Sequence, residues 1–321
     1  MEVIFPCREK KDTLEYYIND GKEHKNVSLE TDTLKEFYIR NGIFEGYEDY
    51  IAEKVKEKIA NRKSKIMGIL NATPDSFYSA SRIINHKIID SMIEQKPDII
   101  DIGGESTRPG SMAIDPSKEF QRLKEPVEYI KSVSKIPLSI DSRNFDTISK
   151  LSKYGIDYIN DISGFGDSRM VKLAAETGVK CILMHMVGTP QTMDNFKNYD
   201  NIYYEINNYF YERASNMVKN QVKPENIILD PGIGFSKGLN ENISIIKYPW
   251  SFFLGFDTLF GTSRKSFIGT VTGESVDGRL AGTIATSIYL NQNGVDILRV
   301  HDPGQNANAI KMYNYIEEYK P

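Results

Sequence analysis

The stretch KIMGILN (65–71) is a short apolar run that ends in a polar residue and breaks at once into the proline-containing loop ATPDSFYS (72–79). An apolar run of this length, without polar alternation, is typical of a strand that is buried on both faces. Loops that follow buried strands often carry binding groups. A fold built from repeats of this unit would gather many polar loop residues along one edge of a sheet.

Seven further runs of the same kind follow along the chain. They are DIIDIGG (98–104), PLSID (137–141), DYINDIS (157–163), CILMHM (181–186), NIILD (226–230), DTLFGTS (257–263) and DILRVHD (296–302). Helix-like segments lie between them, and those at 115–134 and 278–294 are the clearest. Strict alternation of strand and helix predicts an α/β fold. Eight repeats of the unit predict a closed (β/α)₈ TIM barrel, whose ligands bind at the C-terminal strand ends. The alternative is an open doubly wound sheet, which the missing G-x-G-x-x-G after the first strand disfavours.

The composition is that of an ordinary globular protein. The chain has 321 residues, a formal net charge of −4 and two cysteines, Cys7 and Cys181. Two cysteines are too few for a disulfide framework in a chain of this length, so we expect a cytoplasmic protein in a reducing compartment. The acidic balance gives no basic footprint for nucleic acid. No apolar stretch approaches the ~18 residues of a membrane helix. Small molecules are therefore the expected partners, rather than nucleic acid or a membrane.

Residues 1–64 differ from the rest of the chain. They are rich in Lys, Glu, Asp, Asn and Tyr and contain no long apolar run. Within them, the segment 47–63 has Ile51, Val55 and Ile59 at four-residue spacing, which predicts an amphipathic helix. We therefore expect an N-terminal extension at 1–64 and a catalytic barrel at 65–321. The extension is interpreted either as a surface appendage or plug of the barrel bottom, or as a regulatory or oligomer-forming segment.

Polar side chains stand at the end of nearly every predicted strand or in the loop that follows. They are Asn71, Arg108, Asp141, Asn160, His185, Asp230, Lys265, Arg299 and His301. Because the C-terminal ends of barrel strands surround one mouth, we expect these residues to converge there. Burying such groups without partners would cost on the order of 2–7 kcal/mol each. A barrel that served stability alone would have little reason to gather them at one end.

The set divides into two chemical classes. Asp141, Asn160 and Asp230 offer carboxylate and amide edges, which suit a flat heterocycle with N–H and amino donors. The cationic members include arginines, whose forked guanidinium matches phosphate in bidentate fashion. Asn71 offers an oxygen to Mg²⁺, which tolerates a mostly aqueous shell with few protein ligands. His185 stands between two methionines and is interpreted as a supporting residue rather than a metal ligand. Together these residues predict a phosphorylated, nitrogen-rich ring as ligand.

Nine collinear stretches extend this pattern. They are IMGILNATPDSF (66–77), DIIDIGGESTRPGS (98–111), SIDS (139–142), YINDISG (158–164), CILMHMVGTPQTM (181–193), IILDPGIGF (227–235), GTSRKSFIG (261–269), RLAGTIATS (279–287) and RVHD (299–302). In these stretches, which cover nearly all of 65–302, the chain resembles the dihydropteroate synthase family of pterin-binding enzymes. The resemblance implies a TIM barrel of folate biosynthesis that joins 6-hydroxymethyl-7,8-dihydropterin pyrophosphate to 4-aminobenzoate and releases pyrophosphate. It also implies Mg²⁺ as cofactor, a homodimer, and competition by sulfonamides for the 4-aminobenzoate slot.

The resemblance further implies a role for each matching residue. The pterin-binding set is Asp141, Asn160, Ile162, Met184, Asp230, Lys265 and Arg299. The pyrophosphate-binding set is Asn71, Arg108, Arg299 and His301, with Asn71 as the metal ligand. The 4-aminobenzoate-binding set is Phe77, Pro109, Phe235, Lys265 and Ser266. The catalytic set is Asp141, Asp230, Lys265 and Arg108, which would stabilise charge while the C–O bond to pyrophosphate breaks. The aromatic amine then attacks, in a mainly dissociative substitution without a protein nucleophile.

Two parts of the sequence depart from the family's pattern. After TPDSF the family usually continues Ser-Asp-Gly-Gly, whereas this chain has YSAS (78–81), so the glycines that reach conformations closed to other residues are gone. Val187 stands where an arginine or glutamine is common. The changed loop keeps open a related enzyme with a modified aminobenzene acceptor, or a non-catalytic pterin-binding homologue. A pterin-dependent methyltransferase domain would share the Asp141, Asn160 and Asp230 set but should lack Lys265.

Overall fold

Eight parallel strands close into a barrel in the order β10-β11-β4-β5-β6-β7-β8-β9. The computed structural model describes residues 3–10, 13–19, 24–30, 63–72, 82–107 and 110–319. The barrel strands are β4 (Lys65–Asn71), β5 (Ile99–Gly103), β6 (Leu138–Asp141), β7 (Tyr158–Asp161), β8 (Lys180–Met184), β9 (Ile227–Asp230), β10 (Asp257–Phe260) and β11 (Ile297–Val300). Each falls on one of the eight predicted runs. The predicted TIM barrel is confirmed, and the open sheet is wrong.

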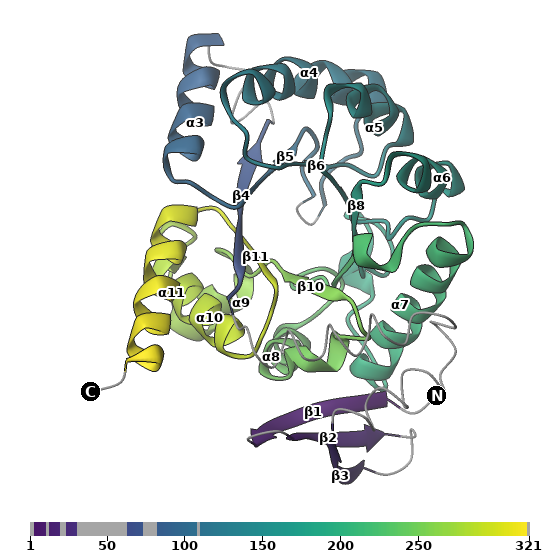
Figure 1. Ribbon diagram of the computed structural model, residues 1–321, viewed down its shortest axis with the longest axis vertical. Coiled ribbons are helices and arrows are strands. Elements are labelled where there is room, and N and C mark those ends of the chain that lie inside the picture. Colours follow the sequence, from purple (N-terminus) through teal and green to yellow (C-terminus); the bar gives the residue numbers. More distant parts are fainter. Residues whose placement is uncertain are drawn as a thin grey trace.

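Helices surround this ring of strands (Figure 1). They are α3 (Arg82–Glu94), α4 (Pro116–Val133), α5 (Phe145–Leu151), α6 (Ser168–Thr177), α7 (Ile202–Lys219), α8 (Leu239–Lys247), α9 (Ser266–Thr272), α10 (Leu280–Gln292) and α11 (Pro303–Glu318). The two helices expected at 115–134 and 278–294 are α4 and α10. Helix α4 begins where the sequence dictates, because the Asp115 carboxylate accepts hydrogen bonds from two backbone N–H groups of the first turn and Pro116 occupies the first helical position.

The barrel interior changes from apolar to polar along the strands. One apolar cluster joins seven strand residues: Met67, Ile99, Tyr158, Ile182, Ile228, Leu259 and Ile297. Side chains on one face of a strand recur every second residue. The next inward position after Ile99 is therefore Asp101, and those after Tyr158, Ile228 and Ile297 are polar as well. The polar groups thus lie above an apolar floor, toward the C-terminal ends of the strands.

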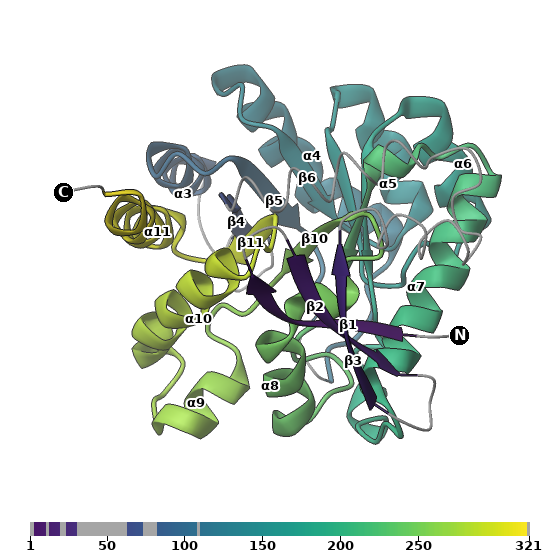
Figure 2. The same cartoon turned by 60° about the horizontal axis from the view of Figure 1, so that its bottom comes forward.

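The N-terminal segment contains strands that the sequence pattern did not predict. Strands β1 (Val3–Lys10), β2 (Thr13–Asn19) and β3 (His24–Glu30) form an antiparallel sheet in that order. Figure 1 shows this sheet outside the ring of barrel strands, and in Figure 2 it comes to the front. The helix predicted at 47–63 lies, up to residue 62, outside the described residues. The proposed boundary between extension and barrel stays a prediction.

No helix within the described parts of the chain is both long and apolar enough to span a membrane.

Candidate active site

Strand register sets the predicted site residues at one level of the barrel. The Cα partners are Asn71 with Gly103, Gly103 with Asp141, and Asp141 with Asn160. Across the next strands, Met184 is the partner of Asp230. These residues are the last or next-to-last of β4 to β9, on the same side of the barrel, so they form an arc around its mouth. The structure brings them together, while their individual roles stay predictions.

Arg299 links this arc through two short ion pairs. Its Nε donates to Asp101 Oδ2 at 2.6 Å, and its Nη2 donates to Asp141 Oδ2 at 2.7 Å. Asn160 Nδ2 donates to the same oxygen of Asp101 at 3.2 Å. Hydrogen bonds between charged groups are shorter and stronger than neutral ones, so the guanidinium plane is held firmly.

Asp101 is a site residue that the sequence pattern of strand ends missed. It is fully buried, and its second oxygen, Oδ1, has no hydrogen-bond partner among the described residues. Asp101 lies two residues before the end of β5, inside a run that is otherwise apolar. The two-residue repeat of side-chain direction in a strand could have found it, because within DIIDIGG it sets Asp101 on the same inward face as Ile99.

The Asp141 carboxyl is held in an environment that disfavours its charge. Burial raises its pKa to about 7, against the lowering effect of Arg299, and the neighbouring carboxylates of Asp101, Glu119 and Asp161 raise it further. In the ligand-free protein the charged form is therefore less stable than it would be in water. A ligand that presents N–H donors to Asp141 would stabilise this charged form.

Asp141→Asn is expected to flatten the pH dependence of stability in the ligand-free protein. Because the carboxyl pKa rises from 3.8 to about 7 on folding, the native state holds a proton that the unfolded state has lost between those values. The free energy of unfolding therefore falls as pH rises through this window. The asparagine variant carries no such proton. Urea unfolding between about pH 4 and pH 8 measures this, with Asp146→Asn, an exposed carboxyl on α5, as control. An equal decline in Asp141→Asn and wild type would contradict the raised pKa.

Asp230 and Lys265 form a second charged group at the mouth. Asp230 is buried and accepts a hydrogen bond from the Gly232 N–H at 2.8 Å. Burial raises the pKa of Asp230 while Lys265 lowers it. Burial also lowers the pKa of Lys265 to about 8, against the attraction of Asp230. The two groups are therefore electrostatic partners across the mouth, as a site for a polar heterocycle requires.

Lys265 also contacts the loop that follows β9. Its Nζ donates to the Ile233 carbonyl and lies 4.7 Å from the centroid of the Phe235 ring, which is a cation–π geometry. Gly234 has a φ of +80°, and a Cβ there would lie 3.1 Å from Lys265 Cδ. A side chain at 234 would therefore strain the backbone and crowd the lysine. This explains the second glycine, Gly234, in the sequence DPGIGF.

An apolar wall adjoins these charges. Ile162, Met184, Met186 and Met193 form one buried cluster, and Phe235 packs against it. Two residues predicted to contact the pterin, Ile162 and Met184, thus share a surface with Phe235, which was predicted to contact 4-aminobenzoate. The mouth combines polar edges with an apolar face, the combination that a flat heteroaromatic ring needs.

His301 directly follows β11, and Ser266 directly follows Lys265. The backbone N–H of His301 donates to Ser263 Oγ at 3.1 Å, and the ring Nδ1 of His301 lies 3.0 Å from the same oxygen. Burial and the positive charge of Arg299 lower the pKa of His301 to about 4, so the ring is neutral at pH 7. Ser266 is exposed at the first position of α9.

Three of the predicted substrate-binding residues, Phe77, Arg108 and Pro109, lie outside the described residues.

Asn71 is the one residue that was predicted to hold a metal. Asn71 is half-buried at the end of β4. No group of three or more His, Cys, Asp or Glu side chains that could hold a metal ion occurs in the part of the chain that the structure describes. A single amide oxygen fits Mg²⁺ bound mostly through water and phosphate oxygens, and it does not fit a metal that needs a full protein cage.

His185 has a supporting position, and its partner was not predicted. Its Nδ1 lies 3.0 Å from the Nζ of Lys237, and its ring meets that of Tyr209 edge-on at 5.0 Å. Lys237 is almost fully buried and also donates to the Phe235 carbonyl at 2.9 Å. Burial lowers the pKa of Lys237 to about 7. This lysine therefore ties the end of β8 to the loop that carries Phe235.

Comparison with known proteins gives concordant matches. A family profile described as pterin binding enzyme matches residues 67–301. The dihydropteroate synthase of Escherichia coli (strain K12) is 36% identical over 254 residues, which are 77% of this chain and 89% of that protein. The crystal structure of Yersinia pestis dihydropteroate synthase with a sulfonamide drug superposes with a TM-score of 0.76 at 30% identity, over 80% of this chain and 95% of that one. The Thermus thermophilus enzyme in complex with 4-aminobenzoate gives 0.72 at 32% identity, over 80% and 95%.

Proposed function

The chain belongs to the pterin-binding enzyme family, among its dihydropteroate synthases, and from this membership we propose how its barrel mouth works. The mouth joins 6-hydroxymethyl-7,8-dihydropterin pyrophosphate to 4-aminobenzoate and releases pyrophosphate. The observation that carries the proposal is the buried assembly in which Arg299 bridges Asp101 and Asp141 beside an apolar wall. The Yersinia relative is a sulfonamide complex and the Thermus relative a 4-aminobenzoate complex, which favours the same acceptor here.

The pterin ring is bound by the polar arc and the apolar wall together. Asp141, Asn160 and Asp230 accept from or donate to the ring's N–H, amino and carbonyl edges. Ile162 and Met184 contact its face, and Arg299 and Lys265 border it. The proximity of these groups in one mouth supports the assignment, because each alone would have a simpler structural explanation.

The diphosphate of the pterin substrate lies toward β4 and β11. The residues assigned to it are Asn71, Arg108, Arg299 and His301. Asn71 would hold Mg²⁺, which when bound supplies positive charge that stabilises the leaving diphosphate. Arg299 contributes a guanidinium whose orientation is fixed by its two carboxylate partners. His301 is neutral at pH 7 and can serve as a hydrogen-bond donor to a phosphate oxygen.

The 4-aminobenzoate slot lies between the loop after β9 and the start of α9. The residues assigned to it are Phe77, Pro109, Phe235, Lys265 and Ser266. Phe235 offers a ring for the benzene face, and the Lys265 ammonium lies 4.7 Å from that ring's centroid. Lys265 therefore borders both substrates, which suits a residue that must bring two reactants together.

The protein contributes positioning and electrostatics to the reaction. The exocyclic C–O bond breaks as negative charge gathers on the diphosphate, which Arg108 and Lys265 stabilise. Asp141 and Asp230 balance the positive charge left on the pterin methylene. The amine of 4-aminobenzoate then attacks this carbon and loses a proton. No protein nucleophile takes part.

Pyrophosphate release by the purified protein tests this function. We expect release to require both the pterin pyrophosphate and 4-aminobenzoate, and a sulfonamide to compete with 4-aminobenzoate. The first alternative, an enzyme for a modified aminobenzene, would instead turn over its own amine in preference. The second alternative, a pterin-binding homologue, would release nothing with either amine, and that result would overturn the proposal.

We also propose a cytoplasmic homodimer with an N-terminal extension (1–64) and a catalytic barrel (65–321). The exposed side of helix α11 supports the homodimer, because it carries large apolar side chains, among them Met312, Tyr315 and Ile316. Exposed apolar patches often mark protein interfaces. Light scattering of the full chain measures the assembly, and a monomer would contradict it.

A further inference from the structure

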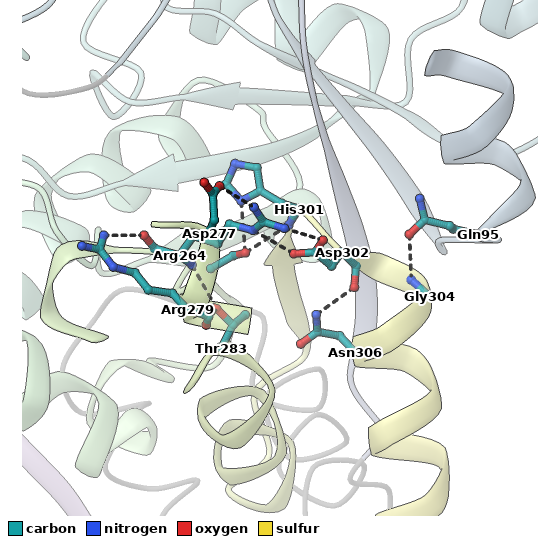
Figure 3. Close-up of polar contacts among 10 residues, drawn as sticks. Gln95, Arg264, Asp277, Arg279, Thr283, His301, Asp302, Gly304 and Asn306 are labelled. Atoms are coloured by element: carbon teal, nitrogen blue, oxygen red, sulfur yellow. Dashed lines mark hydrogen bonds and ion pairs between the residues drawn. The ribbon is translucent and has the colours of Figure 1, made fainter. Parts of the chain in front are cut away.

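Arg264 and Asp302 form a forked ion pair beside the mouth, outside the set of residues assigned to substrates. Arg264 Nε donates to Asp302 Oδ2 at 3.0 Å, and Nη2 donates to Asp302 Oδ1 at 2.7 Å. The pair joins the loop between β10 and α9 to the loop between β11 and α11 (Figure 3). We call it the Arg264–Asp302 brace. Such two-point pairing fixes orientation as well as distance.

The backbone of Arg264 is held as firmly as its side chain. Its φ is +56°, a left-handed conformation that residues other than glycine rarely adopt. The Arg264 N–H donates to Thr283 Oγ1 at 3.0 Å, and its carbonyl accepts from Arg279 Nη1 at 3.0 Å. Strained conformations persist where the surroundings over-determine them, and they concentrate at functional sites. The contacts around Arg264 are of this kind.

The brace connects the two ends of the proposed reaction site. On one side, Lys265 and Ser266 follow Arg264 directly and are assigned to 4-aminobenzoate. On the other side, His301 precedes Asp302 directly and is assigned to the diphosphate. The bond between Ser263 and His301 joins the same two loops again. Because two contacts join the loops, a shift of one loop would also displace the other.

We propose that the Arg264–Asp302 brace is a positioning device that fixes the 4-aminobenzoate contacts relative to the diphosphate contact, an inference that rests on the proposed function. It aligns the attacking amine with the carbon that loses the diphosphate. The two brace residues act through Lys265, Ser266 and His301 and need touch neither substrate. A displacement of about 1 Å at a reacting pair can cost on the order of a hundredfold in rate.

Three variants separate the parts of this proposal. Asp302→Asn keeps the shape and removes the charge. Arg264→Lys keeps the charge and removes the fork. Arg264→Gly removes the side chain while glycine adopts the positive φ without strain, so a defect there does not arise from the backbone. Asp277→Asn is the matched control, because the Asp277 carboxylate is 99% exposed and lies 3.9 Å from Arg264 Nη1.

Two measurements report separately on the 4-aminobenzoate end and the diphosphate end of the site. The KM for 4-aminobenzoate and kcat come from pyrophosphate release, and the Kd for inorganic pyrophosphate comes from calorimetry, which needs no turnover. In all three brace variants we expect kcat to fall by about 10–100-fold, with weaker binding at both ends. The control should match wild type. Thermal unfolding of each variant identifies any that fail to fold, and Arg264→Lys is the mildest change.

Several results would overturn the proposed positioning role of the Arg264–Asp302 brace. If Arg264→Lys behaved as wild type, charge alone would suffice and the fork would have no positioning role. If only one end weakened, the pair would act locally and would not link the two ends. If stability fell while kcat, KM and the pyrophosphate Kd were unchanged, the pair would be merely structural. Failure of the proposed function is seen separately, as a wild-type protein that releases no pyrophosphate.

Discussion

Replacing Asp230 by alanine is expected to abolish measurable binding of the pterin substrate. Asp230 is buried at the end of β9, where burial raises its pKa and Lys265 opposes that shift. In the proposed site its carboxylate receives hydrogen bonds from the ring, and alanine would leave those donors unpaired in a desolvated slot. A site built to hydrogen-bond its substrate loses on the order of 10⁴-fold when one side of the pairing is missing.

Lys265→Ala should have a comparable effect, because it removes the cation that opposes Asp230 and contacts Phe235. Calorimetric titration with the pterin pyrophosphate measures both variants. Glu225→Ala is the control, since Glu225 is an exposed carboxylate in the turn that leads into β9, at the opposite end of the strand from Asp230. Wild-type affinity in either site variant would count against the assignment of the pterin pocket.

Asp101→Ala is expected to damage both stability and binding. Asp101 is fully buried and accepts from Arg299 at 2.6 Å and from Asn160 at 3.2 Å. Removing one partner of a buried ion pair typically costs about 3–5 kcal/mol of unfolding free energy, because the other charge is left uncompensated. Arg299 and Asn160 would also lose their orientation, so pterin binding should weaken in whatever protein remains folded.

Urea unfolding and pterin titration together measure this variant. Asp101→Asn keeps the volume and one acceptor oxygen, so it should lose less stability than alanine but still weaken binding. Glu94→Ala, an exposed carboxylate at the end of α3, is the control. A loss of stability no larger than that of the control would mean that the buried pair is not what holds Arg299.

The barrel could be predicted because its strands carry an unambiguous pattern. Runs such as KIMGILN are apolar between their two end residues, as strands covered by helices must be, and each is followed by a loop and a helix. The positions of Asp141, Asn160 and Asp230 followed from this, since a residue at the end of a parallel strand has only one edge to occupy. Their shared register in the barrel follows from the same geometry.

The supporting contacts were not predictable in the same way. Asp101 and Lys237 lie away from the strand ends, and their partners are 198 and 52 residues distant in sequence. Such pairings depend on barrel closure and loop paths, which local patterns do not contain. The strands β1 to β3 were missed for another reason. Their many charged and polar residues give no apolar run longer than the five residues 3–7, although Leu14, Tyr16 and Ile18 in β2 do alternate with polar or aromatic neighbours.

A crystal structure of the protein with a pterin pyrophosphate analogue and 4-aminobenzoate bound would test the proposed binding mode most directly. We expect the heterocycle to lie within hydrogen-bond distance of Asp141, Asn160 and Asp230, with its diphosphate toward Arg299 and His301. We also expect 4-aminobenzoate to lie between Phe235 and Ser266. Ligands bound elsewhere on the barrel, or a ring that contacts none of these three polar residues, would contradict it.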